Sequence, residues 1–139
     1  MTDQNDYNRH LIEQFRANRE QAGSAFAGRP LLLLTTTGAR SGQPRTVPIM
    51  YIPGGDRLIV IASNAGAPTH PDWYHNLVAH PDVTVEVGDE TYAATAIVTE
   101  GAKRQRIWER VVALHPFFAE HQAKITRTIP VIALERRAG

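Results

Sequence analysis

The chain has 139 residues, which is the length of one domain with a single hydrophobic core. Its formal net charge is +1, so charge gives no reason to expect nucleic acid or an acidic membrane surface as a partner. The sequence has no cysteine, which excludes disulfides, thiolate zinc sites, iron–sulfur clusters and cysteine nucleophiles.

The N-terminal segment is polar, and no apolar run approaches the ~20 residues of a membrane span. We therefore expect a cytoplasmic protein without an integral membrane span, formed by a single domain over residues 1–139. Residues 5–22 place four apolar side chains among charged ones, at the spacing of one helical face: Tyr7, Leu11, Ile12 and Phe15. This pattern predicts an amphipathic helix that ends near Gly23, within an N-terminal helical cover over residues 1–25.

Apolar and β-branched residues then predict about six strands, at 31–37, 45–52, 57–63, 83–87, 91–98 and 129–134. Helices are predicted at 70–80, at 101–114 and in a short segment that begins at Pro116. The connections between strands are hairpin-like, which excludes a regular βαβ succession. We predict an α+β, mainly β domain: a small antiparallel barrel with an N-terminal helix and short helices at its side.

The loop from Thr37 to Arg45 has the composition of an anion-binding turn. Two glycines let its backbone turn with the amides pointing outward, and Arg40, Ser41 and Arg45 flank them. Backbone donors and guanidinium groups together bind phosphate or carboxylate. The alternative is an ordinary β-turn with solvated arginines, since turns are normally rich in glycine and polar residues.

Pro48 interrupts the second predicted strand and cannot donate a ladder hydrogen bond, which indicates an edge strand. An edge strand has unpaired amides and carbonyls that face outward, where a flat heterocycle with alternating donors and acceptors can dock. Two adjacent aromatic residues, Trp73 and Tyr74, lie near the start of the predicted helix at 70–80. They either frame a pocket or belong to the core, because both residue types bury large areas.

Other kinds of catalytic site lack their signatures. His70, His75 and His80 are spaced by five residues and so do not share a helical face, and no HExxH pattern occurs. We therefore expect no metal site. Neither a GxSxG element nor a P-loop is present. Ser63 precedes a glycine-containing loop, where it is either a turn residue or a hydrogen-bond donor of the site.

Four segments, in this order, are similar to those of the deazaflavin-dependent nitroreductase family: TTTGARSGQPRTVPI, RLIVIASNAG, HPDWYHNLVAHPDVTVEV and RTIPVIALER. The resemblance covers residues 31–136 and depends on the joint order and spacing of the four segments. It implies coenzyme F420, an 8-hydroxy-5-deazaflavin, as the cofactor. It also implies the split β-barrel of flavin reductases and pyridoxamine phosphate oxidases. Split barrels often pair, so a homodimer is expected by analogy.

The resemblance also implies which residues bind the cofactor. The positions that hold its phosphate and glutamate tail match Arg40, Ser41 and Arg45. The strand that lines the deazaflavin ring matches Val47, Pro48, Ile49 and Met50. A second ring-contacting segment matches Ile61, Ala62, Ser63 and Asn64, and an aromatic–amide cluster matches Trp73, Tyr74 and Asn76. Some members carry a basic residue in place of Asn64 and tyrosines on the late helix, so substrate preference is not carried over.

The implied reaction is hydride transfer from the reduced deazaflavin to an electron-poor small molecule, such as a quinone, an enone or a nitro-aromatic. Because the cofactor carries the chemistry, the protein needs few catalytic side chains, and Ser63 is the candidate hydrogen-bond donor. The candidates for the substrate pocket are Trp73, His115, Phe118 and His121.

Three alternatives stay open at this point. The first is an FMN-dependent reductase or oxidase of the same fold, and the second is a non-catalytic carrier of the cofactor. The third is a barrel that binds single-stranded nucleic acid, which the near-neutral charge and the lack of a basic stripe disfavour.

Overall fold

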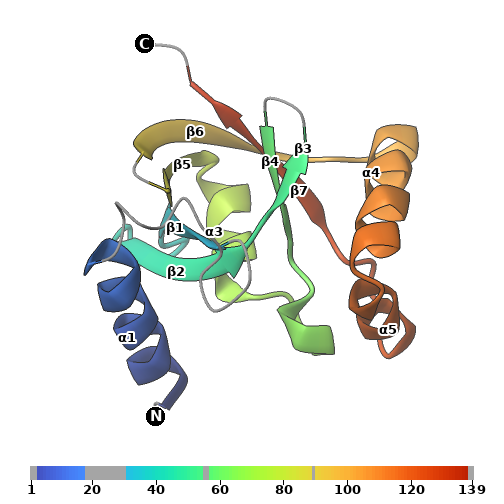
Figure 1. The fold of residues 1–139 in the computed structure, drawn as a ribbon, viewed down its shortest axis with the longest axis horizontal. Helices are drawn as coiled ribbons and strands as arrows, with labels where there is room; N and C mark the ends of the chain where they lie inside the picture. Colours follow the sequence, from blue (N-terminus) through green and yellow to red (C-terminus); the bar gives the residue numbers. More distant parts are fainter. Residues whose placement is uncertain (1–2, 18–30, 55–56, 89, 138–139) are drawn as a thin grey trace.

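The computed structural model describes residues 3–17, 31–54, 57–88 and 90–137 (Figure 1). Its helices are α1 (Asp3–Ala17), α3 (Asp72–Ala79), α4 (Gly101–Leu114) and α5 (Phe117–Ala123), with a 3-10 turn, η1, at Asn64–Gly66. Its strands are β1 (Leu31–Thr37), β2 (Pro44–Met50), β3 (Ile52–Gly54), β4 (Arg57–Ile61), β5 (Asp82–Val87), β6 (Glu90–Val98) and β7 (Val131–Arg136).

The strands form one antiparallel sheet in the order β2-β1-β5-β6-β7-β4-β3. β2 and β3 are the two edges of this sheet, yet only Tyr51 separates them in the chain. The sheet must therefore curl until its two edges meet at that residue, which gives a half-barrel (Figure 1). This confirms the predicted mainly β antiparallel barrel with helices at its side.

The prediction of one strand over residues 45–52 is wrong. The chain changes partner at Tyr51, from β1 on one edge of the sheet to β4 on the other, so this segment forms the two strands β2 and β3. The helix predicted at residues 5–22 corresponds to α1, and residues 18–25 of the predicted cover lie outside the described residues.

The concave face of the sheet encloses the main hydrophobic core. Every second residue of β1, β5, β6 and β7 points inward, as the alternation of side chains in a strand requires. α3 lies inside the curl, where its Leu77 is fully buried (Figure 1). This cluster consists of Leu32, Leu34, Val60, Ala62, Leu77, Val83, Val85, Ala94, Ala96, Ile132 and Leu134.

A second cluster fills the convex face beneath α4 and α5. It combines residues of β3, β4 and β7 that point away from the concave core, the isoleucine two residues before β7, and one side chain from each helix. Its members are Ile52, Ile59, Ile61, Val111, Phe118, Ile129, Val131 and Ala133. Phe118, predicted for the substrate pocket, is only 6% exposed and belongs to this hydrophobic cluster. α5 turns this ring inward because β4 and β7 present aliphatic residues on that side.

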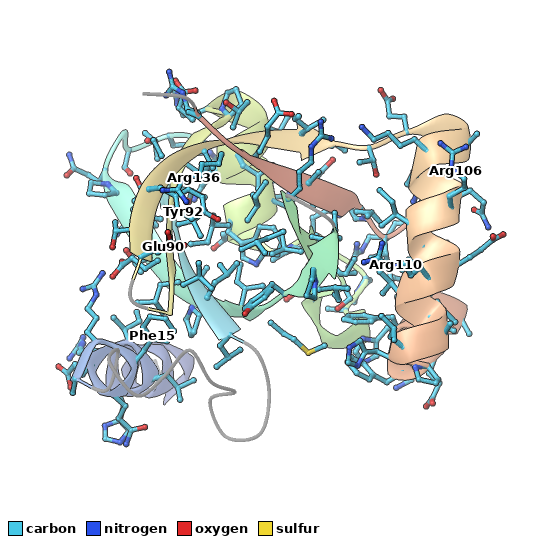
Figure 2. The ribbon with its side chains drawn as sticks, turned by 45° about the horizontal axis from the view of Figure 1, so that its top comes forward. Phe15, Glu90, Tyr92, Arg106, Arg110 and Arg136 are labelled. Carbon is cyan, nitrogen blue, oxygen red and sulfur yellow. The ribbon has the colours of Figure 1, made fainter. Side chains whose placement is uncertain are left out.

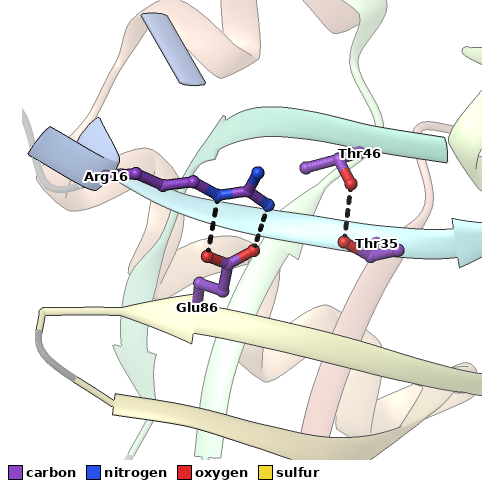
Figure 3. A network of polar contacts seen from close by, with 4 residues as sticks. All are labelled: Arg16, Thr35, Thr46 and Glu86. Atoms are coloured by element: carbon purple, nitrogen blue, oxygen red, sulfur yellow. Dashed lines mark hydrogen bonds and ion pairs between the residues drawn. The ribbon is translucent and has the colours of Figure 1, made fainter. Parts of the chain in front are cut away.

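α1 packs on the convex face of the same sheet, beside β2 and β5. Phe15 lies on the side of the helix that faces the sheet (Figure 2) and is 4% exposed. Arg16 Nε and Nη2 donate to the two carboxylate oxygens of Glu86 on β5, at 3.1 and 2.7 Å (Figure 3). Glu86 is buried, and its hydrogen bond raises the pKa of Arg16. Together these contacts fix α1 to the half-barrel.

Candidate functional site

A groove of about 1230 Å³ runs along the edge strand β2, between α1 and α3. Its lining comes from α1, the loop between β1 and β2, β2 itself and the first turns of α3. The lining residues are Arg9, Ile12, Gly38, Ala39, Arg40, Ser41, Pro44, Arg45, Thr46, Val47, Asp72, Trp73, His75 and Asn76. The groove therefore brings together six residues of the predicted cofactor site: Arg40, Ser41, Arg45, Val47, Trp73 and Asn76.

The loop between β1 and β2 is a tight hairpin whose shape depends on its glycines. Gly38 N donates to Gln43 O at 2.8 Å, and Gly42 N donates to Gly38 O at 3.0 Å. Gly42 has a φ of +71°, in the left-handed region that favours glycine. A Cβ on Gly38 would lie 2.4 Å from Ser41 Oγ, which itself accepts a hydrogen bond from Gln43 N. A side chain at Gly38 would therefore displace Ser41 Oγ, and the φ of Gly42 favours glycine in this turn.

The loop leaves several hydrogen-bond donors available. Within the described residues, the amides of Arg40 and Ser41 have no acceptor, and the guanidinium groups of Arg40 and Arg45 have no carboxylate partner. Both arginines are exposed at the groove. Two amides and two guanidinium groups around one turn have the chemistry of a phosphate or carboxylate site.

Asn76 of α3 fixes this loop from inside the half-barrel. Its Oδ1 accepts a hydrogen bond from Ala39 N at 2.9 Å, and its Nδ2 donates to Thr36 Oγ1 at 3.1 Å. Asn76 is 9% exposed and Thr36 is 2% exposed. The amide group that the resemblance assigns to the cofactor is therefore engaged in holding the β1–β2 loop against β1.

β2 lines the groove with its first four residues, Pro44, Arg45, Thr46 and Val47. Among the described strands it pairs with β1 alone and is an edge strand, as Pro48 predicts. Val47 and Ile49 pack against the concave core, whereas Met50 packs against the convex cluster. The five steps from Arg45 to Met50 span roughly 17 Å of strand. The groove lining ends at Val47, and Pro48, Ile49 and Met50 continue the same strand beyond it.

The second predicted ring-contacting segment does not line the groove. Ile61 belongs to the convex cluster and Ala62 to the concave core. Ser63 is buried, and within the described part of the chain its Oγ has no hydrogen-bond partner. Asn64 is exposed, and its Nδ2 donates to Thr69 O at 2.9 Å. Tyr74 is half-buried, with its ring centroid 4.6 Å from that of His70.

Of the four residues predicted for the substrate pocket, Trp73 lines the groove and the other three do not. His115, Phe118 and His121 meet where α4 passes into α5, with ring centroids 6.3 Å apart for His115 and Phe118 and 6.1 Å for Phe118 and His121. His121 lies against Gly66 of η1, and its Nδ1 is buried without a hydrogen-bond partner in the described structure.

Sequence reasoning missed several groove residues. Arg9 and Ile12 are three residues apart and therefore on one face of α1, but no local signal says which surface that face covers. Asp72 and His75 also line the groove from α3, although neither is among the predicted site residues. Their role depends on the placement of α3 inside the half-barrel, which is a tertiary property.

A smaller cavity of about 240 Å³ lies between α4 and the sheet, and none of the predicted site residues lines it. Its lining residues are Gly54, Arg57, Ile59, Lys103, Ile107, Arg110 and Ala133. Arg110 points from α4 toward the sheet, where its Nη2 donates to Pro53 O (Figure 2).

Among the described residues, no three His, Asp or Glu side chains gather where they could hold a metal ion. No helix in this part of the chain is long and apolar enough to cross a membrane.

Comparison with known proteins gives consistent matches over nearly the whole chain. A family model described as F420H(2)-dependent quinone reductase matches residues 7–136. An F420H(2)-dependent quinone reductase of Mycobacterium tuberculosis is 37% identical over 127 residues, which are 88% of this chain and 85% of that protein. A solved F420-H2 dependent reductase is 42% identical with a TM-score of 0.70, over 77% of this chain and 95% of that one. Another solved structure, described as a domain-swapped dimer, is 39% identical with a TM-score of 0.72, over 91% and 98% of the two chains.

Proposed function

Because the chain belongs to the F420H(2)-dependent quinone reductase family, we propose that it transfers hydride from reduced coenzyme F420 to a quinone bound beside the β2 groove. Membership of this family identifies the protein as an enzyme, a reductase that uses coenzyme F420. The comparisons confirm the family, the fold and the cofactor that the four motifs predict. The alternative cofactor FMN is not needed. Enones and nitro-aromatics stay in the proposal as further acceptors of the same chemical type.

The observation that carries the proposal is that one groove combines an anion-binding loop with an open strand edge. Arg40, Arg45 and the amides of Arg40 and Ser41 have the donors that a phosphate-bearing cofactor needs. The β2 edge offers roughly 17 Å from Arg45 to Met50 for the rest of an elongated molecule. The residues present therefore fit coenzyme F420.

When bound, reduced coenzyme F420 supplies a hydride from the central carbon of its deazaflavin ring. The protein binds the anionic end through Arg40 and Arg45, while Val47 and Trp73 form apolar walls that exclude water. Ile61 and Met50 belong to the same convex cluster, so the end of β4 lies near the end of β2. Ser63 is two residues after Ile61, and we therefore assign it to the Met50 end of β2, the end opposite Arg45. There its Oγ donates a hydrogen bond to the quinone oxygen or the ring atom on which negative charge develops.

A homodimer is part of the proposal, since one solved relative is described as a domain-swapped dimer. Sedimentation or size-exclusion measurements on the purified protein test this part separately. A monomer at all concentrations used for the enzyme assay contradicts it without affecting the assignment of the reaction.

The cofactor site is tested by titration with oxidised coenzyme F420, followed by its fluorescence. Each charge-assisted hydrogen bond contributes about 1.5–3 kcal/mol, so Arg40→Ala and Arg45→Ala should each raise Kd at least about tenfold. Added salt should weaken binding, because both arginines are exposed. Arg137→Gln is the control, since Arg137 is an exposed arginine 3.5 Å from Asp82 and outside the groove. An unchanged Kd in both groove variants contradicts the anion site.

The reaction is tested with reduced coenzyme F420 and menadione, a soluble quinone. Turnover supports the proposed reductase. Tight cofactor binding without turnover on menadione, enones or nitro-aromatics would instead identify a carrier of the cofactor. Tighter binding of FMN than of coenzyme F420 would contradict the assigned cofactor.

A further inference from the structure

The guanidinium group of Arg127, between α5 and β7, makes five hydrogen bonds to the loop that follows β4. Nη2 donates to Ser63 O at 2.9 Å and to Ala67 O at 3.0 Å, and Nε also donates to Ala67 O, at 3.2 Å. Nη1 donates to Ala62 O at 3.2 Å and to His70 Nδ1 at 3.0 Å. A guanidinium group has five N–H donors, so this loop occupies all of them.

None of these acceptors is a carboxylate, and within the described residues Arg127 has no ion-pair partner. Its burial lowers the pKa of the guanidinium group, which nevertheless stays protonated. The side chain therefore holds the shape of the loop and does not neutralise a charge. A lysine at this position has one nitrogen in place of three and cannot reach acceptors arranged around a planar fork.

The segment held in this way, loop 62–70, has a backbone that requires support from outside. Asn64 has a φ of +50° and Gly66 a φ of +83°, so two of its residues are in the left-handed region. Few residues other than glycine adopt this region, although asparagine does so more readily than most. Such conformations persist where the surrounding structure fixes them. Arg127 supplies that constraint from 57 to 65 residues away in the chain.

Arg127 is itself held by two helices. Gln122 of α5 donates from Nε2 to Arg127 O at 2.7 Å and accepts at Oε1 from Ile129 N at 2.9 Å. Arg104 of α4 donates to Ile129 O at 2.6 Å. The two helices on the convex face therefore fix the segment that carries Arg127, and through it loop 62–70.

His70 connects this anchor to the groove. Because arginine only donates, His70 Nδ1 must accept, so the imidazole is neutral with its proton on Nε2. Its ring centroid lies 4.6 Å from that of Tyr74 and 5.7 Å from that of His75, which lines the groove. Burial, then the charges of Arg127 and His75, lower the pKa of His70 and favour this neutral form.

We propose that Arg127 is a positioning residue for the reductase reaction, holding loop 62–70 so that Ser63 stands at the ring-binding end of β2. It acts through the loop and touches neither cofactor nor substrate. This inference rests on the proposed function, which assigns the hydrogen bond to Ser63. Because the anion-binding loop at Arg40 and Arg45 is separate, loss of the Arg127 fork should lower kcat much more than it weakens cofactor binding.

The experiment compares Arg127→Lys, Arg127→Gln and the control Arg137→Gln in three measurements. The first is amide hydrogen–deuterium exchange of the protein without cofactor, the second the pKa of His70 by NMR, and the third kcat with menadione beside Kd for coenzyme F420. Both Arg127 variants should show at least tenfold faster exchange confined to loop 62–70. They should also show at least a tenfold lower kcat and a less than threefold change in Kd. In Arg127→Gln the pKa of His70 should rise toward its ordinary value, because the positive charge is removed.

The inference is overturned if both variants keep the kcat of the control, or if exchange accelerates equally in all strands, which would mean general destabilisation. Should both variants fail to fold, His70→Ala removes one of the four acceptor atoms that the five hydrogen bonds use, and its kcat and hydrogen–deuterium exchange then test the inference. A lower kcat with faster exchange in loop 62–70 supports the inference, and an unchanged kcat overturns it. A wild-type protein that neither binds coenzyme F420 nor reduces menadione contradicts the proposed function instead, and exchange in loop 62–70 then still tests the anchor itself.

Discussion

Replacement of Asn76 by alanine removes the two hydrogen bonds by which α3 holds the β1–β2 loop and β1 together. Ala39 is exposed, so water replaces the lost acceptor of its amide and this loss costs only about 0.5 kcal/mol. Thr36 is 2% exposed, so its hydroxyl stays unsatisfied and costs about 1–3 kcal/mol. The free energy of unfolding should therefore fall by about 1.5–3.5 kcal/mol, which lowers Tm by roughly 5–15 °C in a chain of this length.

The assay pairs thermal melts with the fluorescence titration of coenzyme F420. Asn76→Ala should also raise Kd severalfold, because the amide of Ala39 is no longer held in place. Thr36→Val is the matched control: it removes the hydroxyl but keeps the hydrogen bond from Ala39 to Asn76. This control should lose stability without a change in Kd. A wild-type Tm in Asn76→Ala, or an equal rise of Kd in Thr36→Val, would refute the reasoning.

Three further changes test other parts of the structure. Phe118→Tyr adds a hydroxyl to a ring that is 6% exposed, which should cost about 1–3 kcal/mol and lower Tm while the range of acceptors stays the same. An unchanged Tm with a shift toward polar acceptors would instead indicate that the Phe118 ring lines the substrate pocket. Phe15→Ala should lower the free energy of unfolding by about 3–5 kcal/mol in urea titrations, whereas a loss below about 1 kcal/mol would mean that α1 packs only loosely. The pKa of His70 is lowered in the folded protein, so its contribution to stability is complete above its ordinary pKa of 6.5 and is lost as pH falls below that value. Urea titrations between pH 8 and pH 5 should show that the free energy of unfolding of His70→Gln depends less on pH than that of the wild-type protein. An equal pH dependence in the two proteins would contradict this.

Local patterns in the sequence predicted much of the half-barrel. Val83 and Val85 alternate with polar residues, and both side chains enter the concave core because successive residues of a strand face opposite sides. Pro48 indicated an edge strand, since it has no amide hydrogen to donate, and β2 is the edge of the sheet. Gly42 of the β1–β2 turn was equally informative, because its φ of +71° lies in the region that favours glycine.

The motifs also sufficed to predict the family and the cofactor. These motifs lie in segments whose backbone shape and charge depend on adjacent residues, such as the turn around Arg40 and Arg45. The late helix was different, because two adjacent phenylalanines, Phe117 and Phe118, are equivalent by composition. Only the packing of α5 on β4 and β7 decided which of them is buried in the convex cluster.

Neighbouring residues were therefore enough to predict most helices and strands, the edge strand and the glycine-containing turn, but not the break between β2 and β3 at Tyr51. The tertiary structure alone decided the contacts between distant segments. Asn76 reaches Ala39 across 37 residues, and Arg127 reaches loop 62–70 across 57 to 65 residues. These separations along the chain do not match the period of a strand or a helix, so the sequence pattern does not predict these partners. They meet because the sheet curls until β2 and β3 are joined by one residue, which brings α3 inside the half-barrel and the segment before β7 against the loop after β4.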